Sequence, residues 1–178
     1  RVFEIGSGGG DHAVDFAARF PHLTWQTSDL EENHAQIRAN IARAGLDNVL
    51  APLSFDAASE PDRQHCREHV GEAIFSCNTA HIMSWPAAQS MFRFAGEALP
   101  DGGRFVYYGP FSIGGEFNTP SNRDFDATLR SRDGDMGLRD LAEVDAVAAS
   151  AGLRRVRLYA MPANNFVAVW IKHAGPTQ

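Results

Sequence analysis

The stretch that most constrains this chain is EIGSGGGDH, residues 4–12, in which four of five consecutive positions are glycine. A short apolar run precedes the glycines and an amphipathic stretch follows them, so the sequence predicts a turn from a strand into a helix. Glycine accepts positive φ and carries no Cβ, which lets backbone N–H groups and a helix N-terminus approach a ligand closely. One glycine suffices for a tight turn, whereas this cluster favours a loop that binds a cofactor.

The rest of the chain alternates short apolar runs with amphipathic stretches, the pattern of helices layered on a mostly parallel sheet. Gly45 is expected to end the second helix, and Ser84 to cap the fourth with Pro86 in its first turn. The expected helices span 12–19, 31–44, 60–69, 86–99 and 139–151. The expected strands of this part span 1–6, 23–28, 49–55, 73–78 and 104–108. The fold class is therefore α/β, a three-layer αβα sandwich.

The C-terminal part of the chain changes this pattern. Two β-rich runs, 155–160 and 166–172, are joined only by MPANN. So short a connection permits an antiparallel hairpin, because a parallel crossover needs about a dozen residues or more. The sheet is thus predicted to have seven strands, mostly parallel, and to end with one reversed strand. Residues 109–136 are rich in Gly, Pro, Asn and aromatics, which predicts a long functional loop or lid.

Composition narrows the class of protein. The chain has 178 residues, 44% of them hydrophobic, which suits one domain over residues 1–178. A net charge of −6 disfavours nucleic acid as a partner, and no apolar run approaches the roughly 20 residues that span a bilayer. Cys66 and Cys77 make no disulfide framework, which predicts a cytoplasmic location. The chain begins inside a predicted strand without an initiator Met, so we expect an N-terminal segment before that strand to be missing.

Two acids decide between cofactors. The dinucleotide fingerprint G-x-G-x-x-G would need glycine at position 11, where the chain has Asp11. Glu4 precedes the loop, and a carboxylate beside a pyrophosphate adds repulsion. The same carboxylate suits a ligand that carries positive charge. S-adenosylmethionine carries an ammonium and a sulfonium, with a single carboxylate for the loop amides, and is the predicted cofactor.

The spacing E-x-G-x-G-x-G, realised as Glu4, Gly6, Gly8 and Gly10, resembles the first motif of class I S-adenosylmethionine-dependent methyltransferases. The resemblance implies that Asp29 meets the ribose hydroxyls, although the residue also suits an N-cap of the next helix. It further places Asp56 against the adenine amino group, in a position where acids are common in any case, and Asn78 where donor and acceptor meet. The predicted cofactor-binding residues are Glu4, Gly6, Ser7, Gly8, Gly10, Asp29, Leu30, Asp56, Ala57 and Asn78.

Later motifs point to a narrower family. The segments GSGGGDHAVDFA, PHLTWQTSD, CNTAHIMSW, YGPF, TPSNRDFDATLRSRD, GLRDL and PANNF resemble an uncharacterised methyltransferase-like family of bacteria and animals, catalogued as a domain of unknown function. The resemblance implies the class I methyltransferase fold and cofactor binding, and it names no substrate. Members carry a segment before the first strand. The sequence NTAH, in place of an Asn-Pro-Pro-aromatic motif, disfavours methylation of base or amide nitrogens.

His81 and Tyr108 are the predicted catalytic residues. His81 has a reference pKa of about 6.5, which suits a general base, but a histidine that only holds its loop fits as well. Tyr108 either orients an acceptor or packs. Asn164 and Asn165 are candidate rim residues or ordinary turn residues.

The loop residues Asn122, Arg123 and Asp126 either contact substrate or tie the loop down, and Phe125 either lines an apolar acceptor pocket or packs against the sheet edge. No metal site is predicted. The segment HCREH spaces His65 and His69 as helical ligands, but without a further ligand an exposed helix face is favoured.

The predicted function is methyl transfer from S-adenosylmethionine to a small-molecule or protein acceptor. Three alternatives stay open: a non-catalytic cofactor-binding module, an NAD-dependent oxidoreductase, and an interaction protein that keeps only the fold. The oligomeric state is not predicted.

Overall fold

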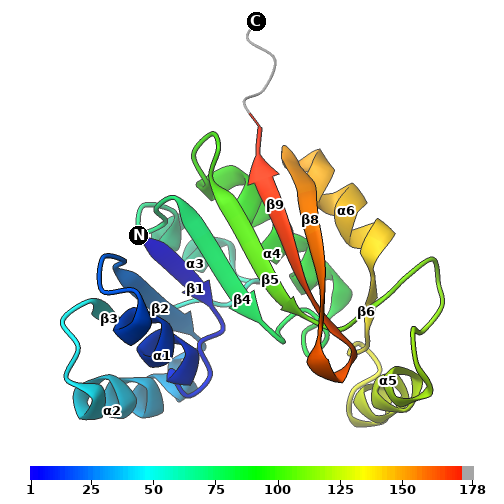
Figure 1. Cartoon of the computed structure of the whole chain (residues 1–178), viewed down its shortest axis with the longest axis horizontal. Coiled ribbons are helices and arrows are strands. Elements are labelled where there is room, and N and C mark those ends of the chain that lie inside the picture. The colour runs from blue at the N-terminus through cyan, green and yellow to red at the C-terminus, as the bar shows by residue number, and fades with distance from the viewer. Residues whose placement is uncertain (174–178) are drawn as a thin grey trace, which may run out of the picture.

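The computed structural model describes residues 1–173, which form a seven-stranded sheet between two layers of helices (Figure 1). Residues 174–178 of the predicted domain lie outside the described residues. The strands of the sheet are β1 (Val2–Ile5), β2 (Trp25–Asp29), β3 (Val49–Ser54), β4 (Ala73–Cys77), β5 (Arg104–Gly109), β8 (Leu153–Met161) and β9 (Asn165–Lys172). The helices are α1 (Asp11–Arg19), α2 (His34–Ala44), α3 (Glu60–Arg67), α4 (Trp85–Ala98), α5 (Pro120–Arg132) and α6 (Leu141–Ser150).

The strand order is β3-β2-β1-β4-β5-β9-β8, and the first five strands run parallel. Strand β9 is antiparallel to both β5 and β8. The predicted fold class is confirmed, with one difference in detail. The reversed strand, β9, lies inside the sheet, and β8 forms its edge. Strand β8 runs parallel to β5 but lies one position further out, and β9 turns back from it to pair with both strands.

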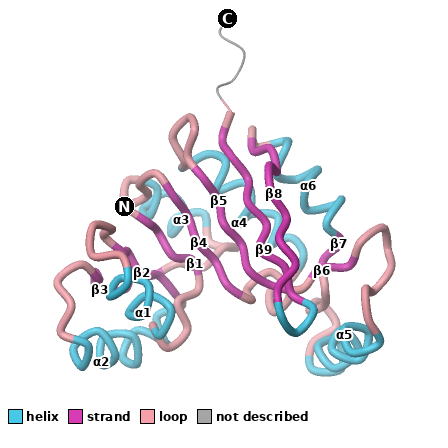
Figure 2. Tube along the Cα trace, viewed as in Figure 1, coloured by secondary structure: helices cyan, strands magenta, loops and turns pink. Residues whose placement is uncertain are grey.

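The two layers follow from the alternation of side chains along each strand. In β1, Val2 packs with Trp25 beneath α1 and α2, whereas Phe3 and Ile5 join the larger core beneath α3, α4 and α6. Helices α1 and α2 cover only the β1–β3 half of their face (Figure 2). On the same face, the apolar side chains of β4, β5 and β9 are half-buried.

Capping residues explain where several of the helices begin or end. Ser84 caps α4, its Oγ accepting from Ala87 N at 3.4 Å, with proline in the first turn as predicted. Gly45 ends α2 at φ 62°, also as predicted. The second helix is split, because the 3-10 turn Glu31–Asn33 precedes α2. Within residues 1–173, no helix combines the length and apolarity that crossing a bilayer demands.

The predicted long loop over 109–136 is wrong, because it contains the 13-residue helix α5. Thr119 caps this helix, accepting from Asn122 N at 3.2 Å, and Pro120 occupies the first turn. Strands β6 (Phe111–Ser112) and β7 (Arg139–Asp140) then form a small parallel sheet. The helix expected from residue 139 accordingly begins later, at α6, with Asp140 as its cap.

Candidate functional site

A cavity of about 440 Å³ opens at the carboxyl ends of β1, β2 and β4, where parallel α/β sheets bind their ligands. We call it the glycine-loop cavity. Among its lining residues, seven were predicted to bind cofactor: Gly6, Gly8, Asp29, Leu30, Asp56, Ala57 and Asn78. The sequence did not single out others that line it, including Glu32, Phe55, Thr79, Ile82 and Met83. They follow strands β2, β3 and β4, and they become neighbours only when these strands pair side by side in the sheet.

The loop backbone explains the glycines. Gly6 has φ +73°, and a Cβ there would stand 2.5 Å from Thr79 Cγ2, so this position has no room for a side chain. Gly8 has φ +57°, and a Cβ there would meet nothing within 4 Å. Because Gly8 lines the cavity, the open space beside it belongs to the cavity. Gly10, at φ +84°, precedes α1 and provides no side-chain cap.

Most amides of this loop already have partners. Gly6 N and Ser7 N both donate to Ser28 O at 3.0 Å, and Gly10 N donates to Ser7 O at 2.8 Å. Gly8 N donates to Asp29 Oδ2 at 2.6 Å. The sequence predicted that the loop amides as a group hold a ligand. The amides that remain for this are those of Gly9 and of the first turn of α1, because a helix leaves its first N–H groups without backbone partners.

The side chain of Glu4, a predicted cofactor-binding residue, lies behind the glycine loop and not at the cavity. The alternation of β1 turns it toward α1, where it is 1% exposed. Its Oε2 accepts hydrogen bonds from Ser7 Oγ at 2.8 Å and Trp25 Nε1 at 2.9 Å. Its Oε1 is buried and has no partner among the described residues. Burial raises the pKa of Glu4 in spite of these two donors. Of the predicted cofactor residues, Glu4, Ser7 and Gly10 do not line the cavity.

The glycine-loop cavity is acidic. Its titratable lining residues, within the part of the chain that the structure describes, are the carboxylates Asp29, Glu32 and Asp56 and the thiol of Cys77, with no Lys, Arg or His. Burial, and then Glu4, raises the pKa of this thiol to about 11, so it stays neutral near pH 7. The charged side chains of the cavity are therefore all negative.

Asp29 is held in place by the protein itself. Besides Gly8 N, its carboxylate accepts from Leu30 N at 2.7 Å and Asn33 Nδ2 at 2.8 Å. Asp29 is the last residue of β2, and α2 begins after Asn33, so the alternative role of helix cap is not its role here. Its carboxylate braces the glycine loop against the end of β2 and keeps one lone pair of Oδ2 for a ligand.

A second cavity of about 530 Å³ adjoins the first and shares Asn78 and Ile82 with it. We call it the hairpin cavity, because the turn between β8 and β9 forms one wall. Its lining residues include His81, Pro110, Asn122, Phe125, Ala163 and Asn165. None of the described side chains around it is Asp, Glu, Lys or Arg.

His81 is the titratable residue of the hairpin cavity. Its side chain is 4% exposed and packs edge-on against Phe125, with ring centroids 5.3 Å apart. Nδ1 is buried without a hydrogen-bond partner in residues 1–173. Burial, and then the charge of Arg139, lowers the pKa of His81 to about 4. The imidazole is therefore neutral near pH 7 and does not hold its loop through a ring hydrogen bond to Nδ1. The loop is held instead by the His81 carbonyl, which accepts from Gly137 N at 3.0 Å.

Tyr108 lies apart from His81. It lines a third cavity, of about 590 Å³, on the half-covered face of the sheet, together with His12, Phe75 and Cys77. Its hydroxyl accepts from Asn165 Nδ2 at 3.2 Å. The structure thus places the two predicted catalytic residues in different cavities, which meet at Asn78.

The loop residues singled out by sequence mostly hold structure together. Asn122 Nδ2 donates to Asn164 O at 3.2 Å, joining α5 to the hairpin turn. Asp126 accepts from Leu138 N at 2.7 Å and Arg130 Nε at 2.8 Å. Arg123 is exposed.

Backbone strain is concentrated at the hairpin cavity. In the described part of the chain, the non-glycine residues with positive φ are Asn78 at 58°, Ala163 at 56° and Asn164 at 60°. Two of them, Asn78 and Ala163, line this cavity. Such conformations cost about 1–3 kcal/mol each and cluster at functional sites.

A further cavity of about 580 Å³ lies at the amino end of β8, beside α6. Two of its charged lining residues, Asp145 and Arg155, pair with each other at 2.8 Å. It is remote from the strand ends that form the other cavities.

The sheet order, with β9 inserted antiparallel between β5 and β8, and the glycine loop after β1 define the fold of class I S-adenosylmethionine-dependent methyltransferases. Within that class, the chain belongs to the family described as "Protein of unknown function (DUF938)", whose model matches residues 1–172.

Solved structures share this fold. An O-methyltransferase family protein from Burkholderia thailandensis superposes with a TM-score of 0.85 at 15% identity, over 98% of this chain and 51% of that one. The mitomycin 7-O-methyltransferase MmcR gives 0.80 at 19% identity, over 97% and 48%. PigF, solved with SAH, gives 0.77 at 15% identity, over 96% and 50%. The chain thus spans about half the length of these proteins, and identities this low show a common fold alone.

Proposed function

We propose that this chain binds S-adenosylmethionine in the glycine-loop cavity and acts as a methyltransferase. The observation that carries the proposal is the charge of this cavity, where Asp29, Glu32 and Asp56 stand beside a glycine loop with no described cation. A sulfonium and an ammonium are attracted there, whereas the diphosphate of NAD would be repelled. The NAD-dependent alternative is disfavoured for that reason.

The residues present fit such a cofactor. Gly8 leaves the cavity open where any other side chain would project. Asp29 keeps one Oδ2 lone pair, and Glu32 lines the cavity with an exposed carboxylate, so both are suited to ribose hydroxyls. Leu30 and Ile82, 43% and 51% exposed, offer apolar surface to an adenine ring. Asp56 and Ala57 belong to the same end of the cavity, after β3.

The cofactor supplies a methyl group activated by its bond to a sulfonium. The protein has to align an acceptor, exclude water and take up a proton where the acceptor arrives protonated. Asn78 borders both cavities, so we place the acceptor in the hairpin cavity beside it. His81 is the titratable residue beside this acceptor position and is neutral near pH 7, although its lowered pKa makes it a weaker base than a free imidazole. Tyr108 borders Asn78 from the other side of the sheet and positions Asn165.

The acceptor we propose is a small molecule that presents a hydroxyl group, rather than a protein. The hairpin cavity has the volume of an ordinary small-molecule site. Its lining combines amides, a neutral imidazole and apolar surface, which suits an uncharged acceptor. The names of two structural relatives, both O-methyltransferases, support a hydroxyl acceptor.

Calorimetry with S-adenosylmethionine, S-adenosylhomocysteine and NAD tests the cofactor. We expect micromolar binding of the first two by the wild type, weakened about tenfold or more by Asp29→Ala, which removes about 1.4 kcal/mol or more of binding energy. Asp29→Asn changes a residue that both braces the loop and borders the cavity, whereas Glu32→Gln changes one that only borders the cavity. Their comparison separates the two roles. Asp47→Ala, an exposed acid in the turn before β3, is the matched control and should bind as the wild type does.

Tight NAD binding, or no binding of either sulfur compound, would overturn the proposal. Binding without turnover of any hydroxyl acceptor would instead indicate a non-catalytic module.

A further inference from the structure

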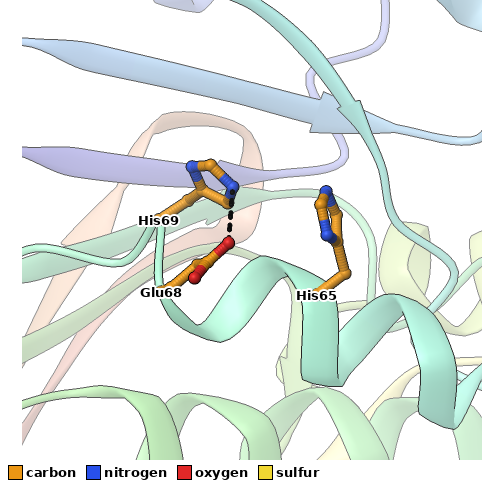
Figure 3. A group of neighbouring side chains, drawn as sticks. All are labelled: His65, Glu68 and His69. Atoms are coloured by element: carbon orange, nitrogen blue, oxygen red, sulfur yellow. Dashed lines mark ion pairs between the residues drawn. The ribbon is translucent and has the colours of Figure 1, made fainter.

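Three potential metal ligands gather at the C-terminal end of α3 (Figure 3), and none of them lines a cavity described above. They are His65 in the last turn of the helix, Glu68 directly after it, and His69. One ring nitrogen from each histidine and one carboxylate oxygen of Glu68 lie within 4.8 Å of one another. His69 Nε2 is 3.7 Å from Glu68 Oε1, and the two imidazole rings have centroids 5.4 Å apart. The sequence showed a histidine pair alone, and the folded turn adds the third ligand.

The backbone explains why these side chains meet. Glu68 keeps helical dihedral angles, φ −71° and ψ −14°, and His69 N donates to Cys66 O at 3.0 Å. The helical path therefore continues to His69, four residues after His65, and positions three and four apart share one face of a helix. His65 and Glu68 are exposed and His69 is half-buried, so an ion reaches the group from solvent.

Two imidazoles and a carboxylate are a ligand set that zinc accepts, at about 2.0–2.2 Å from each ligand atom, with water in a remaining position. Tetrahedral bonds of that length place ligand atoms roughly 3.3–3.6 Å apart. The pair formed by Glu68 and His69, at 3.7 Å, is already close to this spacing. The remaining ligand atoms lie within 4.8 Å of one another, and His65 and Glu68 have exposed side chains that can rotate toward an ion.

Neighbouring groups do not compete for the site. Cys66 points into the core, where it is fully buried and its thiol donates to Ser54 O. Arg67 forms an ion pair with Glu97 of α4, which directs its positive charge toward that helix.

We propose that His65, Glu68 and His69 bind a divalent transition-metal ion of the zinc type. Bound there, the ion joins the last turn of α3 to the segment that leads into β4. Helix α3 starts near the cavity residue Ala57 and has 8 residues, so the metal site lies about 12 Å along the helix from the glycine-loop cavity. Its role is to stabilise the fold, since an ion that binds only the folded state raises stability by mass action. The site is independent of the proposed methyl transfer.

Titration of metal-free, untagged protein with Zn²⁺ in a calorimeter tests the site. We expect one ion per chain at micromolar affinity, weakened about tenfold or more by His65→Ala or His69→Ala and less by Glu68→Gln. Thermal unfolding should shift upward with Zn²⁺ in the wild type and not in His65→Ala/His69→Ala. His22→Ala, an exposed histidine in the turn before β2, is the matched control, and His12→Ala tests the imidazole that lies near Cys77.

The two histidine substitutions change exposed or half-buried side chains, so circular dichroism without metal should match the wild type. Absence of Zn²⁺ binding at millimolar concentration would overturn the proposal. Binding that survives the double histidine substitution, or that is lost in His12→Ala, would also overturn it, because the ion would then lie elsewhere.

Discussion

The two adjoining cavities are built in different ways. The glycine-loop cavity is formed by short segments that directly follow β1, β2, β3 and β4, and its described charges are all negative. The hairpin cavity is formed by three segments far apart in the chain, 78–82, 110–125 and 163–165, and lacks charged side chains apart from what His81 can carry. An acidic cavity suits a cationic cofactor, and an uncharged one suits a neutral acceptor. In the proposed function, this difference in charge separates cofactor binding from acceptor binding.

They also differ in what holds them together. Backbone bonds of the parallel sheet position the glycine-loop cavity, and Asp29 adds a side-chain brace. The hairpin cavity depends on single side-chain contacts, such as Asn122 to Asn164 O, and on strained residues at its rim. We therefore expect substitutions to disturb the two cavities separately.

The largest effect is expected at the glycine loop, from a matched pair of alanine substitutions. Gly6→Ala combines positive φ with overlap against Thr79, so we expect a loss of about 2–4 kcal/mol of unfolding free energy. Gly8→Ala meets no atom, so the loss should be about 1–2 kcal/mol, from positive φ alone. Ligand affinity should show the opposite order, with the larger loss in Gly8→Ala, because its added methyl group projects into cavity space.

Urea unfolding and calorimetry with S-adenosylhomocysteine measure both quantities for each variant. Gly102→Ala, at φ +79° with no atom near its Cβ and remote from the cavity, controls for the cost of positive φ. Equal ligand affinity in Gly8→Ala and Gly102→Ala would show that the space beside Gly8 is not used.

The next effect belongs to the hairpin cavity and appears as a dependence on pH. The pKa of His81 is lowered to about 4 in the folded protein, from about 6.5 when unfolded. Between these values the unfolded chain binds a proton that the folded protein excludes, so stability falls as pH decreases from 6.5 to 4. The contribution lost over this window is about 3 kcal/mol at most.

Comparison of urea unfolding between pH 7.5 and 4.5 isolates this contribution from that of the carboxylates. His81→Leu removes the titrating group, so its stability should fall less steeply below pH 6.5 than that of the wild type. His22→Ala should keep the wild-type slope. Parallel curves for the wild type and His81→Leu would mean that His81 is protonated freely in the folded protein.

The sequence brought together residues that directly follow strands, and their role in binding a cofactor stays a prediction. Gly6, Asp29, Asp56 and Asn78 meet at one cavity because the carboxyl ends of parallel strands share one edge of the sheet. Glu4 was predicted to bind the cofactor from its negative charge and its spacing to the glycines, whereas the alternation of β1 turns its side chain behind the loop.

The second half of the chain was harder to predict for a different reason. Helix α5 buries few residues, and two of them, Asn122 and Asp126, are polar, so it has little apolar periodicity. Its Thr-Pro start was present in the sequence as a capping signal. The position of β9 inside the sheet, and the hairpin cavity with it, depends on tertiary pairing that no local pattern encodes.

The smallest effect should come from the bond that joins α5 to the hairpin. Asn122→Ala removes the donor to Asn164 O, a loss of about 1–2 kcal/mol since Asn122 is 4% exposed. Asn118→Ala is the matched control, because it removes the acceptor of the other Asn122 bond, 2.7 Å long, and leaves the hairpin contact intact. Hydrogen exchange of the β8–β9 turn should quicken in Asn122→Ala more than in Asn118→Ala. S-adenosylhomocysteine affinity should stay unchanged in both, because neither asparagine lines the glycine-loop cavity. A weakened affinity in Asn122→Ala would mean that the two cavities are coupled through Asn78, and the separation argued above would fail.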